Sequence, residues 1–215
     1  MKFFETIGFT FAAAVLAFVA ATPVHNAPAH NAMYERAQAT THVLQEVDIV
    51  MGETKCSATA VGPHALLTAS HCEHPFDLIT VDTETMQIVV HPMRDNLDHT
   101  IYIVDKSFSV WAKIAAEPPQ QGDEFFYFGN PGVYKRYMRK GYIAGFDLTS
   151  LNINQIALDV NGYYGDSGAA LFNENGEIVS IFSQLQTQHD ELNAAKFCYA
   201  WPFNFSSAQL DRAAQ

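Results

Sequence analysis

The stretch Glu117-Pro-Pro-Gln-Gln-Gly-Asp123 divides the sequence into two series of short runs that have the composition of β-strands. The runs before it are His42 to Met51, Ala58 to Val61, Ala65 to Thr68, Met86 to Val90 and Ile101 to Val104. The runs after it are Glu124 to Phe128, Gly141 to Phe146, Gln155 to Val160, Ala169 to Phe172, Ile178 to Ser183 and Phe197 to Trp201. Two series of about six strands, joined by a Pro-containing connector, predict an all-β fold of two six-stranded antiparallel β-barrels.

The composition is that of an ordinary globular protein. Of the 215 residues, 48% are apolar and 16% are charged, which excludes a disordered or collagenous chain. The aromatic content of 13% favours strands over helical bundles. Twelve Lys and Arg against 23 Asp and Glu give a net charge of -11, so we expect no nucleic-acid partner. We interpret the basic run from Tyr134 to Lys140 as a hairpin tip in solvent; a surface for acidic partners or RNA is the alternative.

Residues 1–21 resemble a secretory signal segment, because Lys2 is followed by an apolar run from Ile7 to Ala21 and then by Pro23. As a helix, this run would rise only about 22 Å, which is short of the roughly 30 Å hydrocarbon core of a membrane. We therefore expect a secreted or periplasmic protein. Membrane contact through an uncleaved N-terminal segment is the alternative.

Residues 22–42 are rich in Ala, contain Pro23 and Pro28 and show no apolar periodicity, which predicts a linker or propeptide rather than a packed element. The folded domain is expected over residues 43–215, with one barrel at about 43–116 and the other at about 122–203. The tail from Ser206 to Ala213 predicts a short C-terminal helix with Ser206 or Ser207 as its N-cap.

Three segments contain residues suited to nucleophilic catalysis: Thr68-Ala-Ser-His71-Cys72, Asp98-His-Thr-Ile-Tyr-Ile-Val104 and Gly165-Asp-Ser167-Gly168. A serine alcohol is a poor nucleophile at neutral pH. Acyl transfer therefore needs an imidazole to take its proton and a carboxylate to hold that imidazole in the right tautomer. Glycines on both sides of Ser167 suit a tight turn that exposes the hydroxyl and aims backbone N–H groups at a developing oxyanion.

In these motifs the sequence resembles the trypsin-like serine proteases of the chymotrypsin fold, over roughly Val43 to Trp201. Residues 122–131 and 168–178 are similar to compact bacterial and viral members and to Htr-type proteases. The resemblance implies a serine endopeptidase with His71 as general base, Asp98 as orienting acid and Ser167 as the nucleophile that forms an acyl-enzyme. The N–H groups of Gly165 and Ser167 would form the oxyanion hole. Protein or peptide substrates are implied, with no cofactor and no metal.

The resemblance also implies a disulfide between Cys56 and Cys72, while Cys198 is expected to be a buried free thiol. Two reduced cysteines are the alternative for the pair. Asp98 is preferred to Asp95 as the orienting acid because an apolar strand follows it directly. Asp95, within a polar run, is interpreted as a solvated turn residue. Asp166 is expected to pair with a group other than a new N-terminus, since no zymogen activation sequence is found.

The substrate pocket is assigned to Asn161, Tyr163, Tyr164 and Ser183. Asn161 occupies the place where trypsins carry an acid, and a neutral amide disfavours cleavage after Lys or Arg. Asp159 would take this place if the alignment shifted by two residues. Ser183 resembles the serine that hydrogen-bonds the catalytic carboxylate. Phe197 is expected to lie across the pocket.

Other functions fit the sequence less well. Cys56, His71, Cys72 and His74 include metal-ligand types, but adjacent residues of a strand point to opposite faces. An α/β-hydrolase would need the order Ser, Asp, His, which is reversed here. The remaining alternative is a catalytically impaired, protease-like binding protein.

Overall fold

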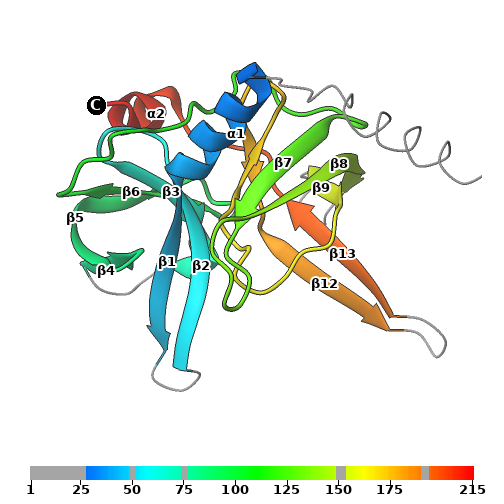
Figure 1. The fold of residues 1–215 in the computed structure, drawn as a ribbon, viewed down its shortest axis with the longest axis horizontal. Coiled ribbons are helices and arrows are strands. Elements are labelled where there is room, and N and C mark those ends of the chain that lie inside the picture. The colour runs from blue at the N-terminus through cyan, green and yellow to red at the C-terminus, as the bar shows by residue number, and fades with distance from the viewer. Residues whose placement is uncertain (1–27, 49–51, 74–76, 149–153, 190–193) are drawn as a thin grey trace, which may run out of the picture.

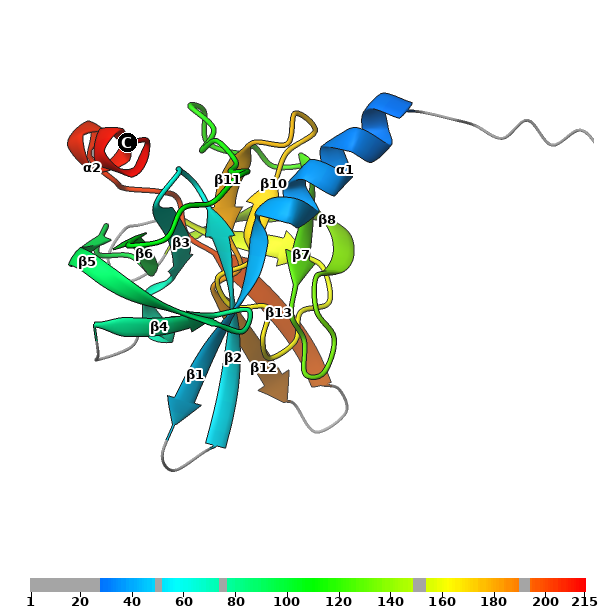
Figure 2. The same cartoon turned by 60° about the vertical axis from the view of Figure 1, so that its left-hand side comes forward.

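The computed structural model describes residues 28–48, 52–73, 77–148, 154–189 and 194–215. Within these ranges the strands form two antiparallel units, which Figures 1 and 2 show side by side. No helix in the described part of the chain combines the length and the apolar composition that a membrane crossing requires. The segment from Ile7 to Ala21 lies outside the described residues.

The first unit is a closed barrel in the order β1-β2-β3-β6-β5-β4. Its strands are β1 (Thr41–Asp48), β2 (Gly52–Ala60), β3 (Ala65–Ala69), β4 (Leu78–Val81), β5 (Glu84–Arg94) and β6 (His99–Val104). The sequence did not predict β4, which has only four residues and closes the barrel by pairing with both β1 and β5.

The second unit is a curled, seven-stranded half-barrel in the order β11-β10-β7-β8-β9-β13-β12. Its strands are β7 (Glu124–Gly129), β8 (Tyr137–Leu148), β9 (Asn154–Asp159), β10 (Ala170–Phe172), β11 (Ile178–Ile181), β12 (Gln184–His189) and β13 (Ala194–Ala200). The predicted all-β fold of two antiparallel units is confirmed, and the second unit is an open, curled sheet of seven strands where a closed barrel of six was expected. The additional strand is β12, whose largely polar sequence lacks the apolar run used to predict strands; it forms through pairing with β13.

The helix α1 (Pro28–Thr40) precedes the first barrel, so the prediction of no packed element over residues 22–42 is wrong for this part. The Tyr34 ring packs edge-on against Phe126 with centroids 4.6 Å apart, and Ala37 is buried. The helix lacks a strong amphipathic pattern, so its stability depends on contacts with β1 and β7 that periodicity does not reveal. Figure 2 shows α1 lying beside the upper ends of these strands.

The predicted C-terminal helix is α2 (Ser207–Ala213), and Ser206 is its N-cap. Ser206 and Gln209 form a capping box, in which each side chain accepts a hydrogen bond from the other residue's backbone N–H. The helix docks closely on the barrel at Gly62, where an added Cβ would lie 1.8 Å from the carbonyl oxygen of Ala213.

The strand β7 contributes to both hydrophobic cores because its side chains alternate between the two faces of the sheet. Phe126 and Phe128 pack into the core that includes the first barrel. Phe125 and Tyr127 pack into the core of the half-barrel. The two units are therefore joined through a continuous apolar contact, beside which the cleft described below lies.

A polar cluster around Asp82 also joins the two units. Asp82 Oδ2 lies 3.0 Å from His42 Nδ1 and 2.9 Å from Arg136 Nη2, and Asp82 Oδ1 accepts the N–H of Val43 at 3.1 Å. Burial raises the pKa of Asp82, but its hydrogen bonds to His42 and Val43 and the charge of Arg136 outweigh burial and lower it. Arg136 is half-buried and paired, so the expectation of a solvated hairpin tip is wrong at this residue.

The lowered pKa of Asp82 predicts a pH dependence of stability. An acid whose pKa is lowered in the folded state stabilises that state above about pH 4, and this stabilisation is lost as pH falls through the lowered pKa. We expect the melting temperature of Asp82→Asn to fall less between pH 5 and pH 3 than that of the wild type. Glu84→Gln, in the same turn but with an exposed ion pair, is the control and should behave as the wild type. Equal falls in all three proteins would refute the role of Asp82.

Candidate active site

The side chains of His71 and Asp98 are directly hydrogen-bonded. His71 follows the buried strand β3 in the short 3-10 helix η1 (Ser70–Cys72), and Asp98 immediately precedes β6. His71 Nδ1 lies 3.0 Å from Asp98 Oδ2, and the backbone N–H of His71 donates to Asp98 Oδ1 at 3.1 Å. The Asp98 side chain is 15% exposed and that of His71 is 47% exposed. With Nδ1–H donating to the carboxylate, Nε2 is left as the proton acceptor of the ring.

Ser183, in the half-barrel, donates a hydrogen bond from its hydroxyl to Asp98 Oδ2. This is the contact that the family resemblance implied for Ser183. It connects the segment between β11 and β12 to the start of β6, so both structural units hold the carboxylate. Asp98 Oδ1 accepts from the His71 N–H and Oδ2 accepts from Ser183. Each carboxylate oxygen therefore has a donor that fixes the orientation of the carboxylate.

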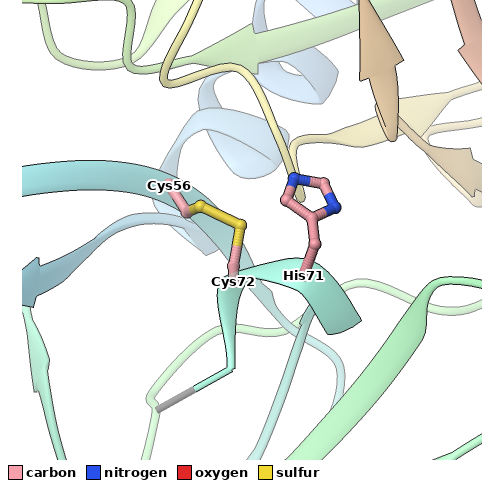
Figure 3. Close-up of side chains that lie close together, drawn as sticks. All are labelled: Cys56, His71 and Cys72. Atoms are coloured by element: carbon pink, nitrogen blue, oxygen red, sulfur yellow. A yellow bond between two sulfur atoms is a disulfide. The ribbon is translucent and has the colours of Figure 1, made fainter. Parts of the chain in front are cut away.

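Cys56 and Cys72 form a disulfide with their Cα atoms 6.3 Å apart. Figure 3 shows it beside His71, tethering the end of η1 to β2. The two sulfur atoms and a His71 ring nitrogen lie within 4.8 Å of one another. Sulfurs bonded to each other are not thiolate ligands, so this cluster does not support the alternative of a metal site. His74 lies outside the described residues, and Cys198 is a buried free cysteine, as expected.

The loop from Tyr164 to Gly168 contains Ser167, and each of its peptide carbonyls from Tyr164 to Ser167 accepts a hydrogen bond. The donors are, in order, Gly132 N at 3.4 Å, Ser57 Oγ at 2.8 Å, Ala169 N at 2.9 Å and Ser57 N at 2.7 Å. The N–H of Asp166 donates to Tyr163 O at 3.0 Å, and that of Gly168 donates to Phe182 O at 2.7 Å. Across the described part of the chain, the N–H groups of Gly165 and Ser167 have no acceptor. These two donors are available to a ligand.

Two positions of this loop require glycine. Gly165 has φ +101°, and an added Cβ would lie 2.3 Å from the carbonyl oxygen of Asn130. Gly168 has φ +81°, and an added Cβ would lie 2.1 Å from the carbonyl oxygen of Ser57. Both the backbone conformation and the close approach of neighbouring backbone therefore exclude other residues.

A cleft of about 1060 Å³ brings the predicted site residues together. His71, Asp98, Gly165, Ser167 and Ser183 all line it, together with Tyr163 and Tyr164. No hydrogen bond joins the Ser167 hydroxyl to another described residue; hydrogen bonds between nucleophile and base are often long without substrate. Sequence reasoning missed several lining residues, which come from separate elements and share no motif: Lys55, Leu97, Gly132, Phe182, Gln184, Leu185 and Trp201.

Asn161 and Phe197 do not line this cleft. They line a second pocket with Asp159, on strands β8, β9 and β13. Tyr163 lines both pockets. Gly162 packs closely against Phe182 of the cleft and Cys198 of the second pocket, since an added Cβ there would lie 2.1 Å from Phe182 Cζ and 3.0 Å from Cys198 Sγ. The structure therefore does not bring the predicted specificity residue Asn161 to the cleft.

A family model described as a trypsin-like peptidase domain matches residues 56–181, which is more than half of the chain. The chain belongs to the trypsin-like peptidase domain family. This membership supports a protease that acts on proteins or peptides. No curated protein sequence matches the chain.

Solved structures agree with this peptidase fold. The chain is similar to the active form of the Rv3671c protease from M. tuberculosis, at 16% identity and a TM-score of 0.68, over 87% of this chain and 86% of that one. An inactive form matches at 15% identity and a TM-score of 0.65, over 88% and 96% of the two chains. An inactive serine-to-alanine mutant of Rv3671c matches at 16% identity and a TM-score of 0.63, over 90% and 95%. At this identity the similarity shows the fold alone.

Asp166 of the peptidase domain is fully buried next to Ser167 and pairs with an internal cation. Asp166 Oδ2 lies 2.8 Å from Arg139 Nη1 and accepts hydrogen bonds from Tyr127 Oη at 3.1 Å and Tyr163 N at 2.9 Å. Burial raises the pKa of Asp166, and the Arg139 charge partly offsets this effect. Burial, together with the Asp166 charge, also raises the pKa of Tyr127 far above its ordinary value. Arg139 is thus a second member of the basic run that is not a solvated tip residue.

Asp95 is 2% exposed, so its interpretation as a solvated turn residue is wrong. Its Oδ2 lies 2.5 Å from His99 Nδ1 and accepts the N–H of Asn204 at 3.0 Å. Burial raises the pKa of Asp95, but the His99 hydrogen bond and charge outweigh burial and lower it. The polar sequence around Asp95 suggested solvent, whereas a residue 109 positions away covers it. Asp98, and not Asp95, contacts His71.

The buried Asp166–Arg139 ion pair predicts that removing Arg139 destabilises the fold more than removing the adjacent Lys140. Arg139→Met should lower the free energy of unfolding by about 3–5 kcal/mol, because it leaves a buried carboxylate without its cation. Lys140→Met breaks an exposed pair with Glu124 and should cost about 1 kcal/mol or less. Urea denaturation of both variants measures the difference. Equal losses would refute a special role for the buried pair.

The disulfide predicts a defined thiol content. Peptide mapping without reduction should recover Cys56 linked to Cys72, and one thiol, Cys198, should react after denaturation. Replacing both linked cysteines by alanine should cost about 3 kcal/mol in the chain-entropy model for a loop of this size. Three reactive thiols in the purified, unreduced protein would contradict the structure.

Proposed function

We propose that the protein is a serine endopeptidase that hydrolyses peptide bonds through an acyl-enzyme on Ser167. The observation that supports this most is the arrangement in the cleft: a carboxylate-bound histidine and a serine whose loop leaves two backbone N–H groups without acceptors. This arrangement provides the three functions that acyl transfer needs, which are a base, a nucleophile and an oxyanion site.

In the proposed reaction, His71 Nε2 takes the proton of Ser167 Oγ as that oxygen attacks the scissile carbonyl carbon. The carbonyl oxygen becomes an oxyanion, which accepts hydrogen bonds from the N–H groups of Gly165 and Ser167. Asp98 stabilises the resulting imidazolium. The imidazolium then gives its proton to the leaving amine, and the C–N bond breaks to leave the acyl-enzyme. Water, deprotonated by His71, attacks the ester carbon; the ester C–O bond then breaks, the imidazolium returns the proton to Ser167 Oγ, and the acid is released.

We expect the substrate to be an extended peptide with apolar side chains next to the scissile bond. Leu97, Leu185 and Trp201 line the cleft. Among its described lining residues, Asp98 is the only acid, and both of its oxygens already bind protein groups. Nothing in this lining offsets the charge of a substrate Lys or Arg, so cleavage after these residues is disfavoured.

We propose that the protein works in a secreted or periplasmic setting. A disulfide next to the catalytic histidine persists in oxidising compartments and not in a reducing cytosol. The signal-like segment 1–21 supports the same location. Membrane contact is expected only through this segment, if it is not cleaved.

The nucleophile assignment is tested with a fluorophosphonate probe, which modifies activated serines. The wild type should be labelled at one site, and Ser167→Ala should lose labelling while keeping its melting temperature. Ser109→Ala, an exposed serine outside the cleft, is the control and should be labelled like the wild type. Labelling that persists in Ser167→Ala would refute the assignment. An unlabelled, folded wild type would instead favour the protease-like binding protein.

The role of His71 predicts how labelling depends on pH. Only neutral imidazole can accept the serine proton, so the labelling rate should rise with pH as the imidazolium loses its proton. His71→Ala should remove this dependence and lower the rate at least a hundredfold. A rate that stays flat from pH 5 to pH 8 in the wild type would contradict general-base catalysis by histidine.

A further inference from the structure

We propose that Ser57 and Asn130 form a bridge between the two structural units that positions the oxyanion site. The inference rests on the proposed function, since it assigns positioning residues to that same site. Neither residue belongs to the catalytic motifs, and neither lines the cleft. Both are fully buried. Ser57 lies on β2 of the closed barrel, whereas Asn130 follows β7 of the half-barrel.

Ser57 hydrogen-bonds two peptide units of the loop, one on each side of the Asp166–Ser167 peptide. Its hydroxyl donates to the carbonyl of Gly165 at 2.8 Å, and its backbone N–H donates to the carbonyl of Ser167 at 2.7 Å. At their other ends, the same two peptide units donate through Asp166 N to Tyr163 O and through Gly168 N to Phe182 O. Each of these two peptide units is therefore hydrogen-bonded through both its carbonyl and its N–H. These hydrogen bonds prevent the two peptide units from rotating and so determine the direction of the neighbouring Gly165 and Ser167 N–H groups.

Asn130 orients the Ser57 hydroxyl. Asn130 Nδ2 donates to Ser57 Oγ at 2.9 Å and to the carbonyl of His42 at 3.1 Å. Asn130 Oδ1 accepts the N–H of Arg136 at 2.9 Å. The backbone partners of Asn130 therefore establish which end of its side-chain amide is the oxygen and which is the nitrogen. Because Ser57 Oγ accepts from Asn130, its own proton is directed to Gly165 O. Successive hydrogen bonds of this kind strengthen one another in a buried site.

The bridge matters for catalysis because the proposed base and nucleophile belong to different units. His71 is on the closed barrel and Ser167 is on the half-barrel, so a displacement between the units changes their relation directly. A misplacement of about 1 Å can cost about a hundredfold in rate, and loss of one oxyanion donor costs about 100- to 1000-fold. We expect loss of the Ser57 hydroxyl to lower the rate of acyl transfer about 10- to 100-fold through loosening of the loop.

The first test compares two buried hydroxyls on β2 by their rate of fluorophosphonate labelling. Ser57→Ala should be labelled 10- to 100-fold more slowly, to the same final extent and with an unchanged pH midpoint, since the His71–Asp98 contact is intact. Thr59→Val is the matched control, because Thr59 is fully buried and its hydroxyl has no hydrogen-bond partner among the described residues. It should be labelled at the wild-type rate. A Ser57→Ala rate within twofold of the wild type, or an equal loss in Thr59→Val, would overturn the proposal.

The second test asks whether the two residues act as one bridge. Asn130→Asp keeps the acceptor for the Arg136 N–H but removes the donors to Ser57 and His42, so it should also slow labelling. The double variant Ser57→Ala, Asn130→Asp should be no more than about threefold slower than the slower single variant, because both changes break the same connection. Losses that multiply would show independent effects and would overturn the bridge.

Hydrogen exchange gives a reading that does not depend on catalysis. In Ser57→Ala, amides within residues 163–168 should exchange faster than in the wild type, while those of β3 and β6 should keep their protection. Unchanged exchange in this loop would overturn the proposal even if labelling slowed. A folded wild type that is not labelled would refute the proposed function, and the exchange experiment would still decide whether Ser57 holds the loop.

Discussion

Backbone N–H groups without partners are costly in a folded loop, because each buried unpaired polar group costs free energy. From Gly165 to Gly168, N–H groups without and with an acceptor among the described residues alternate. The carbonyls of residues 164–167 accept hydrogen bonds, and the N–H groups of Asp166 and Gly168 donate, while those of Gly165 and Ser167 have no acceptor among the described residues. A ligand oxygen that accepts from these two groups would complete the set.

The negative charge of Asp166, next to the loop's serine, is paired with groups of the half-barrel itself. Asp166 is buried directly next to the proposed nucleophile and would be costly without compensation. Arg139 on β8, Tyr127 on β7 and the N–H of Tyr163 provide part of that compensation at Oδ2, while Oδ1 has no hydrogen-bond partner among the described residues. Close approach of Asp166 also requires Gly129, where an added Cβ would lie 2.0 Å from Asp166 Oδ1. The half-barrel thus holds the loop through the partners of Asp166, while the closed barrel contacts the loop through Ser57.

The sequence predicted elements well where local pattern and tertiary environment agree. The apolar runs of β3, β6 and β7 are buried strands, and the short motifs around His71, Asp98 and Ser167 meet in one cleft. It failed for α1, β4 and β12, whose short or polar sequences are stabilised by neighbouring elements. Asp95 was misjudged for the same reason, because its polar neighbours say nothing of Asn204, which covers it.

By itself, the sequence determined the all-β class and the residues of the proposed chemistry, because strand patterns and catalytic motifs depend on neighbours in the chain. The partner of Asp166, the separation of Asn161 from the cleft and the contacts of Ser57 with the loop were decided by tertiary structure alone. The Asp166–Arg139 pair lies within the half-barrel, whereas the contacts of Ser57 with the loop run between the two units. Both join residues that are far apart in the sequence. Serine, asparagine and arginine make such contacts in many settings and show no sequence periodicity, so only the packing of strands and loops in the folded protein selects their partners.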